Sequence, residues 1–197
     1  MNDFLVEGYQ LGDAIPVLDG HSLLDVWECV SFGGRWYEPP IPREYLAKCL
    51  RVNAHHQSCI TKKRQCAFIP HRLLSREEFS AFVLDWLIFA DGFLSPVRNR
   101  LGGILRYERV MAKWTRRGRQ DLSQYFYLVP GELEHSFEPG AVFHLRAADV
   151  NQEIYGVPDY LAALQSALLN ESATLFRRRF YNNGAHAGFI LYSTDTS

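Results

Sequence analysis

The sequence lacks the marks of several protein classes, beginning with paired cysteines. None of its four cysteines belongs to a Cys-x-x-Cys pair. They are Cys29, Cys49, Cys59 and Cys66. A secretory signal is also missing from the first residues, so we expect reduced thiols in a cytosolic protein. The most apolar run, residues 79–90, is too short to span a membrane and contains Asp85, so we expect no membrane among the partners.

An excess of positive charge is missing as well. The sequence contains 21 lysines and arginines and 22 aspartates and glutamates, so the formal net charge is −1. A protein that grips nucleic acid needs a basic surface, so this balance argues against a DNA clamp but permits a surface past which DNA slides. Residues 61–64 form the strongest basic cluster, which we interpret as a solvated turn or helix face, with a phosphate contact as the alternative. Trp114 and the arginines within 116–119 fit either a hairpin end with exposed arginines or a nucleic-acid patch.

Catalytic motifs are absent too. The sequence contains no Gly-x-Ser-x-Gly, no phosphate-binding loop and no His-Glu-x-x-His. Cys59 with His55 or His56 comes nearest to a nucleophile–base pair or a zinc site, but the spacing matches no ligand pattern. Asp85 has no evident partner base, so we expect it to be a hydrogen-bonded structural carboxylate. We predict that the chain is not an enzyme and has no catalytic residue, no cofactor and no metal.

The sequence does contain a pattern of helices, then strands, then one long helix. We expect residues 1–20 to form an extended arm, and such arms gain order by lying on a neighbour. Apolar spacing predicts a helix over 22–30 that ends at Gly33-Gly34. A proline-containing loop over 35–42 and a second helix over 43–58 are expected to follow.

A third helix is predicted after Ser75, which forms a capping-box pattern with Glu78, and Gly92 is expected to end it. Beyond residue 92 the apolar period changes to that of strands. The expected strands cover residues 93–98, 104–110, 124–129 and 141–145, with a hairpin loop at 99–103. This order of elements predicts an α+β chain with a small antiparallel sheet.

The longest predicted element lies near the carboxyl end. Pro158 suits a first helical turn, and no glycine or proline follows until Asn183-Gly184, which offers a helix end. At 1.5 Å per residue, this helix would be roughly 36 Å long. An apolar stripe runs along it and is interrupted once by a carboxylate. The stripe consists of Leu161, Leu164, Leu168, Glu171 and Leu175.

Two interpretations of this stripe remain open. The helix either lies across the core of its own domain, or packs side by side with copies of itself. In the second case, the five stripe residues are candidates for subunit packing. Glu171 would then pair with Arg177, Arg178 or Arg179 of a neighbouring copy, and these three arginines are also candidates for lining a DNA channel.

Three blocks of this region carry a resemblance to a known family. They read DVNQEIYGVP over 149–158, NESATLFRR over 170–178 and NGAHAG over 183–188. The blocks resemble the portal protein of tailed bacteriophages, the head–tail connector, and in particular the PBSX type of temperate phages with contractile tails. The segments RWYEPP at 35–40 and KWTRRG at 113–118 agree with the same family.

The resemblance implies a fold and a passive role. It implies a wing-like α+β domain over 1–157, a long stem-type helix over 158–183 and the start of a clip-like segment over 184–197. The ring, a dodecamer in the family, would sit at the unique capsid vertex of the virion after assembly in the host cytoplasm. Its implied partners are other copies of the chain, the terminase, capsid and scaffold proteins, head-completion proteins, and double-stranded DNA passing through the channel.

Portal proteins of this family continue well beyond the segment that matches Ala187-Gly188. The present chain ends at Ser197, so we expect either a shortened portal chain or a prophage-derived gene product. A second hypothesis follows, in which the chain is an interaction module that joins intact portal rings and interferes with their assembly.

Overall fold

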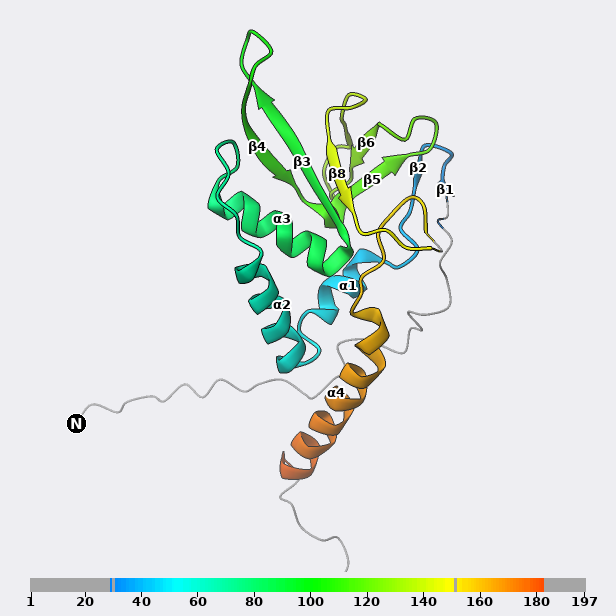
Figure 1. Cartoon of the computed structure of the whole chain (residues 1–197). Helices are drawn as coiled ribbons and strands as arrows, with labels where there is room; N and C mark the ends of the chain where they lie inside the picture. The colour runs from blue at the N-terminus through cyan, green and yellow to red at the C-terminus, as the bar shows by residue number, and fades with distance from the viewer. Residues whose placement is uncertain (1–28, 30, 151, 183–197) are drawn as a thin grey trace, which may run out of the picture.

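The computed structural model describes Cys29, residues 31–150 and residues 152–182 (Figure 1). Four predictions lie outside the described residues. They are the arm over 1–20, most of the helix over 22–30, the helix end at Asn183-Gly184 and the clip-like segment over 184–197.

The described chain begins with a short hairpin where a loop was predicted. Strands β1 (Ser31–Phe32) and β2 (Trp36–Tyr37) pair antiparallel. Gly33 and Gly34 have φ of +56° and +70°, so they form the tight turn between the strands. The predicted loop over 35–42 is therefore wrong at its start, because two aromatic residues suit a strand when a partner strand lies beside them.

This hairpin is the edge of a five-stranded antiparallel sheet, in the order β1-β2-β5-β6-β7. The remaining strands are β5 (Thr115–Gly118), β6 (Tyr125–Tyr127) and β7 (His135–Ser136). A single 3-10 turn, η1 (Ala112–Trp114), leads into β5. The strand predicted over 124–129 is confirmed in its middle part.

The single helix predicted over 43–58 is wrong, because two helices occupy this region. They are α1 (Arg43–Cys49) and α2 (Ala54–Cys66). Between them Asn53 is extended, and its side chain accepts a 2.8 Å hydrogen bond from the backbone N–H of His55. This N-cap favours a new helix start over continuation. The basic cluster at 61–64 lies on α2 with Lys62 and Lys63 exposed, as the helix-face interpretation expected.

The third helix is confirmed as α3 (Arg76–Phe89), capped by Ser75, whose Oγ accepts from the N–H of Glu78 at 3.2 Å. Its predicted end at Gly92 is wrong. The left-handed residue that closes it is Ala90, with φ of +59°. Gly92 already belongs to a strand, where an added Cβ would lie 2.6 Å from the Phe82 ring. Its glycine is therefore needed for close helix–sheet packing.

A second, three-stranded sheet follows in the order β4-β3-β8. The predicted hairpin is confirmed as β3 (Asp91–Arg98) and β4 (Ile104–Val110), and β8 (Phe143–Arg146) pairs with β3 on its other side. Helix α3 lies along this sheet (Figure 1). The α+β class is confirmed, with two small antiparallel sheets in place of the predicted one.

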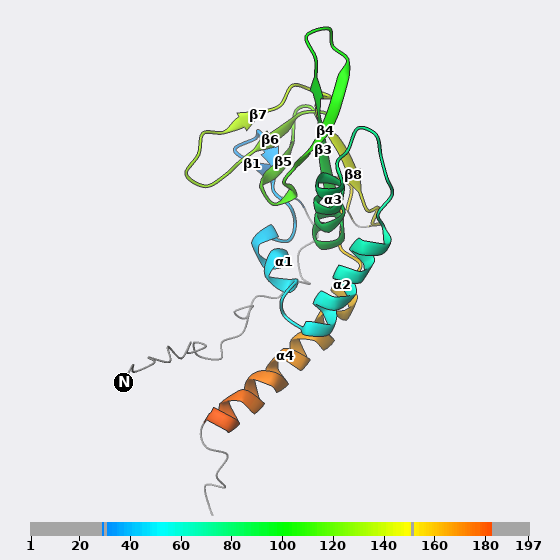
Figure 2. The same cartoon turned by 90° about the vertical axis from the view of Figure 1, so that its left-hand side faces the viewer.

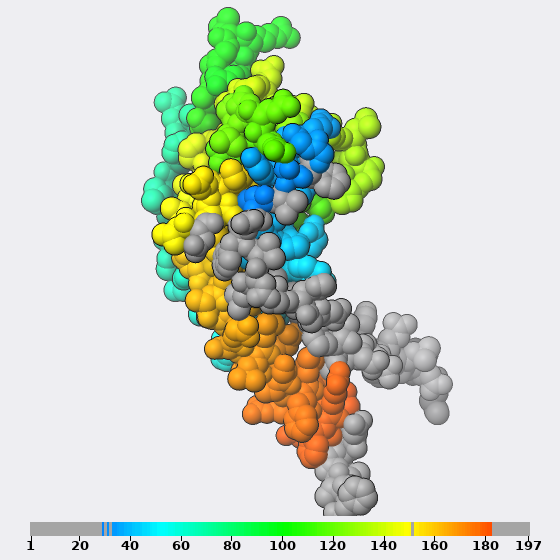
Figure 3. All heavy atoms as spheres, turned by 90° about the vertical axis from the view of Figure 1, so that its right-hand side faces the viewer, coloured from blue at the N-terminus to red at the C-terminus, as the bar shows by residue number. Residues whose placement is uncertain are grey.

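The last element, α4 (Leu161–Asn182), is one continuous helix. Pro158 and the two residues after it form a turn rather than the predicted first helical turn. Helix α4 leaves the body of the molecule at the end opposite the β3–β4 hairpin tip, as Figures 1, 2 and 3 show from three directions. Within the described residues, no helix has the length and apolar character needed to cross a membrane.

Candidate assembly site

The junction between α4 and the body is built around one buried carboxylate, Asp91. Ala90 turns the chain out of α3 so that Asp91 begins β3 inside the core. Its Oδ2 accepts from Arg43 Nη2 at 2.8 Å, and its Oδ1 accepts from the N–H of Gly156 at 2.9 Å. His144 Nε2 lies 2.7 Å from the same Oδ1. Asp91 thus joins α1, β8 and the segment that leads into α4.

Arg43 is the buried cation that matches this carboxylate. Its guanidinium donates to the backbone oxygens of Ala112 and Thr115, and lies 4.9 Å from the centre of the Tyr155 ring. Burial lowers the pKa of Arg43, while Asp91 acts in the opposite direction. A buried ion pair of this kind fixes an arrangement more than it adds net stability, because both charges have lost their hydration.

The segment from Tyr155 to Tyr160 is held at both ends by hydrogen bonds to the body. The Tyr155 hydroxyl donates to the backbone oxygen of Tyr37 at 2.5 Å and accepts from the N–H of Arg117 at 2.8 Å. The Tyr160 hydroxyl donates to the backbone oxygen of Ile88 at 2.9 Å. Burial raises the pKa of both phenols, so they remain neutral donors. These bonds set the direction in which α4 leaves the body.

Acidification should destabilise this junction through His144. Burial lowers the pKa of His144, and the hydrogen bond to Asp91 only partly opposes that shift. The unfolded chain therefore takes up a proton on this ring at a higher pH than the folded chain does. The stability contributed by neutral His144 is present above the unfolded pKa of about 6.5 and is lost as the pH falls through the window below it.

Urea unfolding at about pH 7.5 and about pH 5.5 measures this loss. We expect a smaller loss for His144→Gln, whose amide still donates to Asp91 but does not titrate. Equal losses in the two proteins would contradict the prediction.

Helix α4 buries the stripe that the sequence pointed to, and it does so against its own chain. Leu161 and Leu164 are each only 4% exposed and belong to the main hydrophobic core, and Leu168 packs at its edge. Glu171 is buried, and Leu175 is half-buried. The body of the same chain therefore covers Leu161 and Leu164, and the packing of this stripe between subunits stays a prediction.

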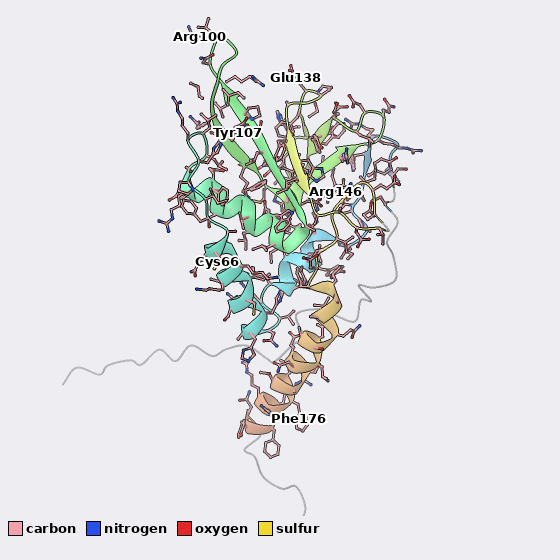
Figure 4. All side chains as sticks on the ribbon, in the orientation of Figure 1. Cys66, Arg100, Tyr107, Glu138, Arg146 and Phe176 are labelled. Atoms are coloured by element: carbon pink, nitrogen blue, oxygen red, sulfur yellow. The ribbon has the colours of Figure 1, made fainter. Side chains whose placement is uncertain are left out.

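A second apolar stripe on α4, which we call the outer stripe, was missed at the sequence level. It consists of Leu169, Phe176 and Phe180, which are 73%, 71% and 48% exposed. At about 100° per residue these three side chains share one side of the helix, roughly opposite Leu164 and Glu171. Figure 4 shows Phe176 near the far end of α4, away from both sheets. The spacing of seven and four residues was the available signal.

The three arginines of α4 point in different directions. Successive residues of a helix are about 100° apart, so Arg177, Arg178 and Arg179 spread over more than half of its circumference. Arg178 is half-buried on the side of the helix that carries Leu164 and Glu171, and Arg177 and Arg179 are exposed. Their lining of a DNA channel or pairing between subunits stays a prediction.

The arginines near Trp114 are engaged within the fold. Arg116 Nε donates to Glu38 at 2.6 Å, and Arg117 donates to the backbone oxygens of Leu122 and Ile154. Lys113 Nζ lies 4.4 Å from the centre of the Trp114 ring. These contacts favour a structural network over the nucleic-acid patch that the sequence left open.

The residues considered for catalysis or metal binding lie on two helices, α2 and α3. The His56 ring packs on Tyr160 with centroids 4.8 Å apart, and Cys59 is exposed on α2. Asp85 accepts from Arg109 Nε at 2.7 Å and from the N–H of Ala112 at 3.0 Å, so it is the structural carboxylate that was predicted. Across residues 31–150 and 152–182, no three His, Cys, Asp or Glu side chains are grouped so that they could hold a metal ion.

The phage relatives found by comparison of the sequence with known proteins include two probable portal proteins, whereas no family model matches. The chain is 50% identical over 194 residues to a probable portal protein of Escherichia phage P2, covering 96% of this chain and 56% of the relative. It is 35% identical over 168 residues to a probable portal protein of Haemophilus phage HP1, covering 81% of this chain and 48% of the relative. The chain thus spans about half the length of these curated relatives.

Solved structures share the fold at low sequence identity. One chain from the neck of an empty gene transfer agent particle, solved with C6 symmetry, superposes with a TM-score of 0.62 at 17% identity, covering 76% of this chain and 50% of that one. A chain from the neck of the native particle, solved with C12 symmetry, gives a TM-score of 0.58 at 16% identity, covering 75% and 51%.

Proposed function

The chain is a homologue of phage portal proteins over nearly its whole length, and we propose that it forms the wing and the first stem helix of a portal ring subunit. In this proposal residues 31–157 are the wing and α4 is the stem helix. The ring sits at one vertex of the capsid, is assembled in the host cytoplasm and becomes part of the virion. The PBSX type remains a proposal within the same family.

The outer stripe of α4 is the observation that carries this proposal. Leu169, Phe176 and Phe180 are exposed to water on a helix that extends away from the body. An exposed apolar patch of this kind indicates a surface that packs on another protein. In a closed ring the outer stripe of one stem helix would pack on the neighbouring stem, with Arg177 or Arg179 pairing across the interface or facing the channel. The solved chains with this fold lie in necks determined with C6 and C12 symmetry, which is consistent with a ring.

The proposed role is passive and non-enzymatic. The terminase would drive double-stranded DNA through the ring, and head-completion proteins would dock after packaging, with capsid and scaffold proteins around the vertex. A wall past which DNA slides must bind it weakly, because each neutralised phosphate adds affinity. The net charge of −1 and the internally engaged arginines of β5 suit such a wall.

A charge placed in the outer stripe should strongly lower entry of the chain into portal rings. The assay mixes the chain with the full-length portal protein of phage P2 and measures mixed rings by native mass spectrometry. Phe176→Asp places a charge in the expected stem contact, and we expect incorporation to fall by about tenfold or more, since one desolvated carboxylate costs over ~1.4 kcal/mol.

The matched control is Leu133→Asp. Leu133 is also a highly exposed apolar residue, but it lies in the loop between β6 and β7. Incorporation should be unchanged in this control. Equal incorporation of Phe176→Asp and the unaltered chain would refute the stem contact.

A further inference from the structure

An apolar groove, distinct from the outer stripe, lies on the α3 side of the three-stranded sheet. Its volume is about 470 Å³. The apolar residues that line it include Ile69, Leu74, Phe79, Tyr107, Phe143 and Leu145. Ile69 is 68% exposed and Phe143 is 54% exposed, so the groove is open to an occupant.

The groove exists because α3 covers only part of its sheet. Phe82 of α3 packs with Leu94 and against Gly92 of β3. Phe143 and Leu145 are two residues apart on β8 and therefore point to this same face. Beyond the reach of α3 they remain exposed.

One rim of the groove is basic. A neighbouring depression of about 660 Å³ shares His71, Leu74 and Tyr107 with the groove. Three arginines line this depression: Arg72, Arg76 and Arg106. Arg72 and Arg76 form no ion pair with any residue in the described part of the chain.

The two carboxylates in the neighbouring depression are already engaged. Glu78 accepts from the N–H of Arg109 at 2.6 Å, and Glu108 accepts from Arg106 Nε at 2.9 Å. An occupant that fits this rim is therefore apolar with flanking negative charge.

The sequence holds one segment of that chemistry. Residues 1–28 contain six acidic residues and no lysine or arginine. The six are Asp3, Glu7, Asp13, Asp19, Asp25 and Glu28. Within this segment Phe4, Leu5 and Val6 stand between Asp3 and Glu7, which is the pattern an apolar groove with a basic rim would select.

The placement of the groove favours an occupant from another copy of the chain. Strand β1, which follows this segment, lies at one side of the body, and the start of α3 and β4 lie at the other (Figure 1). A head-to-tail ring brings opposite sides of adjacent subunits together. The 24 residues between Phe4 and Cys29 span up to about 80 Å when extended.

We propose that residues 3–7 of one subunit bind in the groove between α3 and β8 of the adjacent subunit, with their carboxylates on the Arg72 and Arg76 rim. This inference rests on the proposed ring function. It adds a contact in the wing that is independent of the outer stripe of α4.

Photo-crosslinking tests the contact directly. Full-length chain carrying p-benzoylphenylalanine in place of Phe4 is mixed with an equal amount of ¹⁵N-labelled chain and irradiated, and the products are mapped by mass spectrometry. We expect links to labelled peptides that contain residues 69–79 or 143–145. Links confined to the same chain, links only outside the groove, or no links would overturn the proposal.

A charge swap separates binding from folding. Combined Arg72→Glu and Arg76→Glu should lower the yield of links between chains by about tenfold, and Asp3→Lys with Glu7→Lys on the photo-reactive partner should restore it. A folding defect would not be rescued by the second pair. Phe143→Asp should lower the yield as well, whereas the control Leu133→Asp should not.

The two proposals fail separately. If mixed rings form with the P2 portal protein but the photo-reactive residue at position 4 links outside the groove, only the groove assignment would be overturned. Links in the groove between chains that never enter such rings would support the groove and overturn the proposed function.

Discussion

Replacing Gly156 with alanine should lower the free energy of unfolding by about 3 kcal/mol or more. An added Cβ would lie 2.1 Å from the backbone oxygen of Ala90 and 2.7 Å from its carbonyl carbon. That oxygen cannot simply move away, because it also accepts from the N–H of Ala147 at 2.8 Å. The hydrogen bond from the N–H of Gly156 to Asp91 would be lost at the same time. Urea unfolding followed by circular dichroism gives the difference.

Gly103→Ala is the matched control for this prediction. An added Cβ there would meet only the side chain of Asn99, at 3.1 Å, on an exposed hairpin loop. We expect a change below about 1 kcal/mol. A Gly156→Ala protein as stable as this control would show that the segment before α4 is not held tightly to the end of α3.

Replacing Asp91 with alanine should have the largest effect of any single change, about 4 kcal/mol of lost stability. Asp91 accepts hydrogen bonds from Arg43, His144 and the N–H of Gly156, and all of them lie inside the protein. Its removal leaves the Arg43 charge buried without a counter-charge. The stability is lost because the Arg43 cation remains desolvated without a partner, and the loss does not measure the net contribution of the ion pair to stability.

The control for Asp91 is an exposed ion pair of the same kind. Arg106 and Glu108 pair on β4 with both side chains in solvent. Glu108→Ala should change stability by less than about 1 kcal/mol, because water screens an exposed pair. A similar cost for both substitutions would mean that water reaches Asp91 and that the junction is looser than its contacts indicate.

Both changes act at the junction from which α4 leaves the body, so they connect stability to the proposed assembly. A ring of identical subunits requires every stem helix to leave its wing in the same direction. The bonds from Tyr155, Gly156 and Tyr160 to the body supply that direction. We therefore expect partly destabilised junction variants to lose incorporation into rings while their outer stripe is intact.

Local signals predicted several elements correctly. Ser75 caps α3, the strands on either side of 99–103 form a hairpin, and α4 runs unbroken to Asn182. Each of these depends on neighbours in sequence: a side chain three residues from its partner, glycines in a short loop, or a run of good helix formers.

Other elements depend on contacts that are distant in sequence. Trp36 and Tyr37 form a strand because Arg117 and Gly118 lie beside them, although these two residues come much later in the chain. Helix α3 ends at Ala90 rather than at Gly92 because Asp91 is already part of β3, where it contacts Arg43 and His144. Neither could be read from a window of neighbouring residues.

The sequence by itself determined the α+β class, the long terminal helix and the resemblance to portal proteins, because periodicity, capping residues and conspicuous blocks are properties of the chain alone. Only the tertiary structure decided which side of that helix packs into the core. It buries Leu161 and Leu164 and leaves Leu169 and Phe176 in solvent. When a helix has apolar residues on two sides, its sequence does not indicate which side packs against its own domain. That choice depends on where the Asp91–Arg43 ion pair positions the start of the helix.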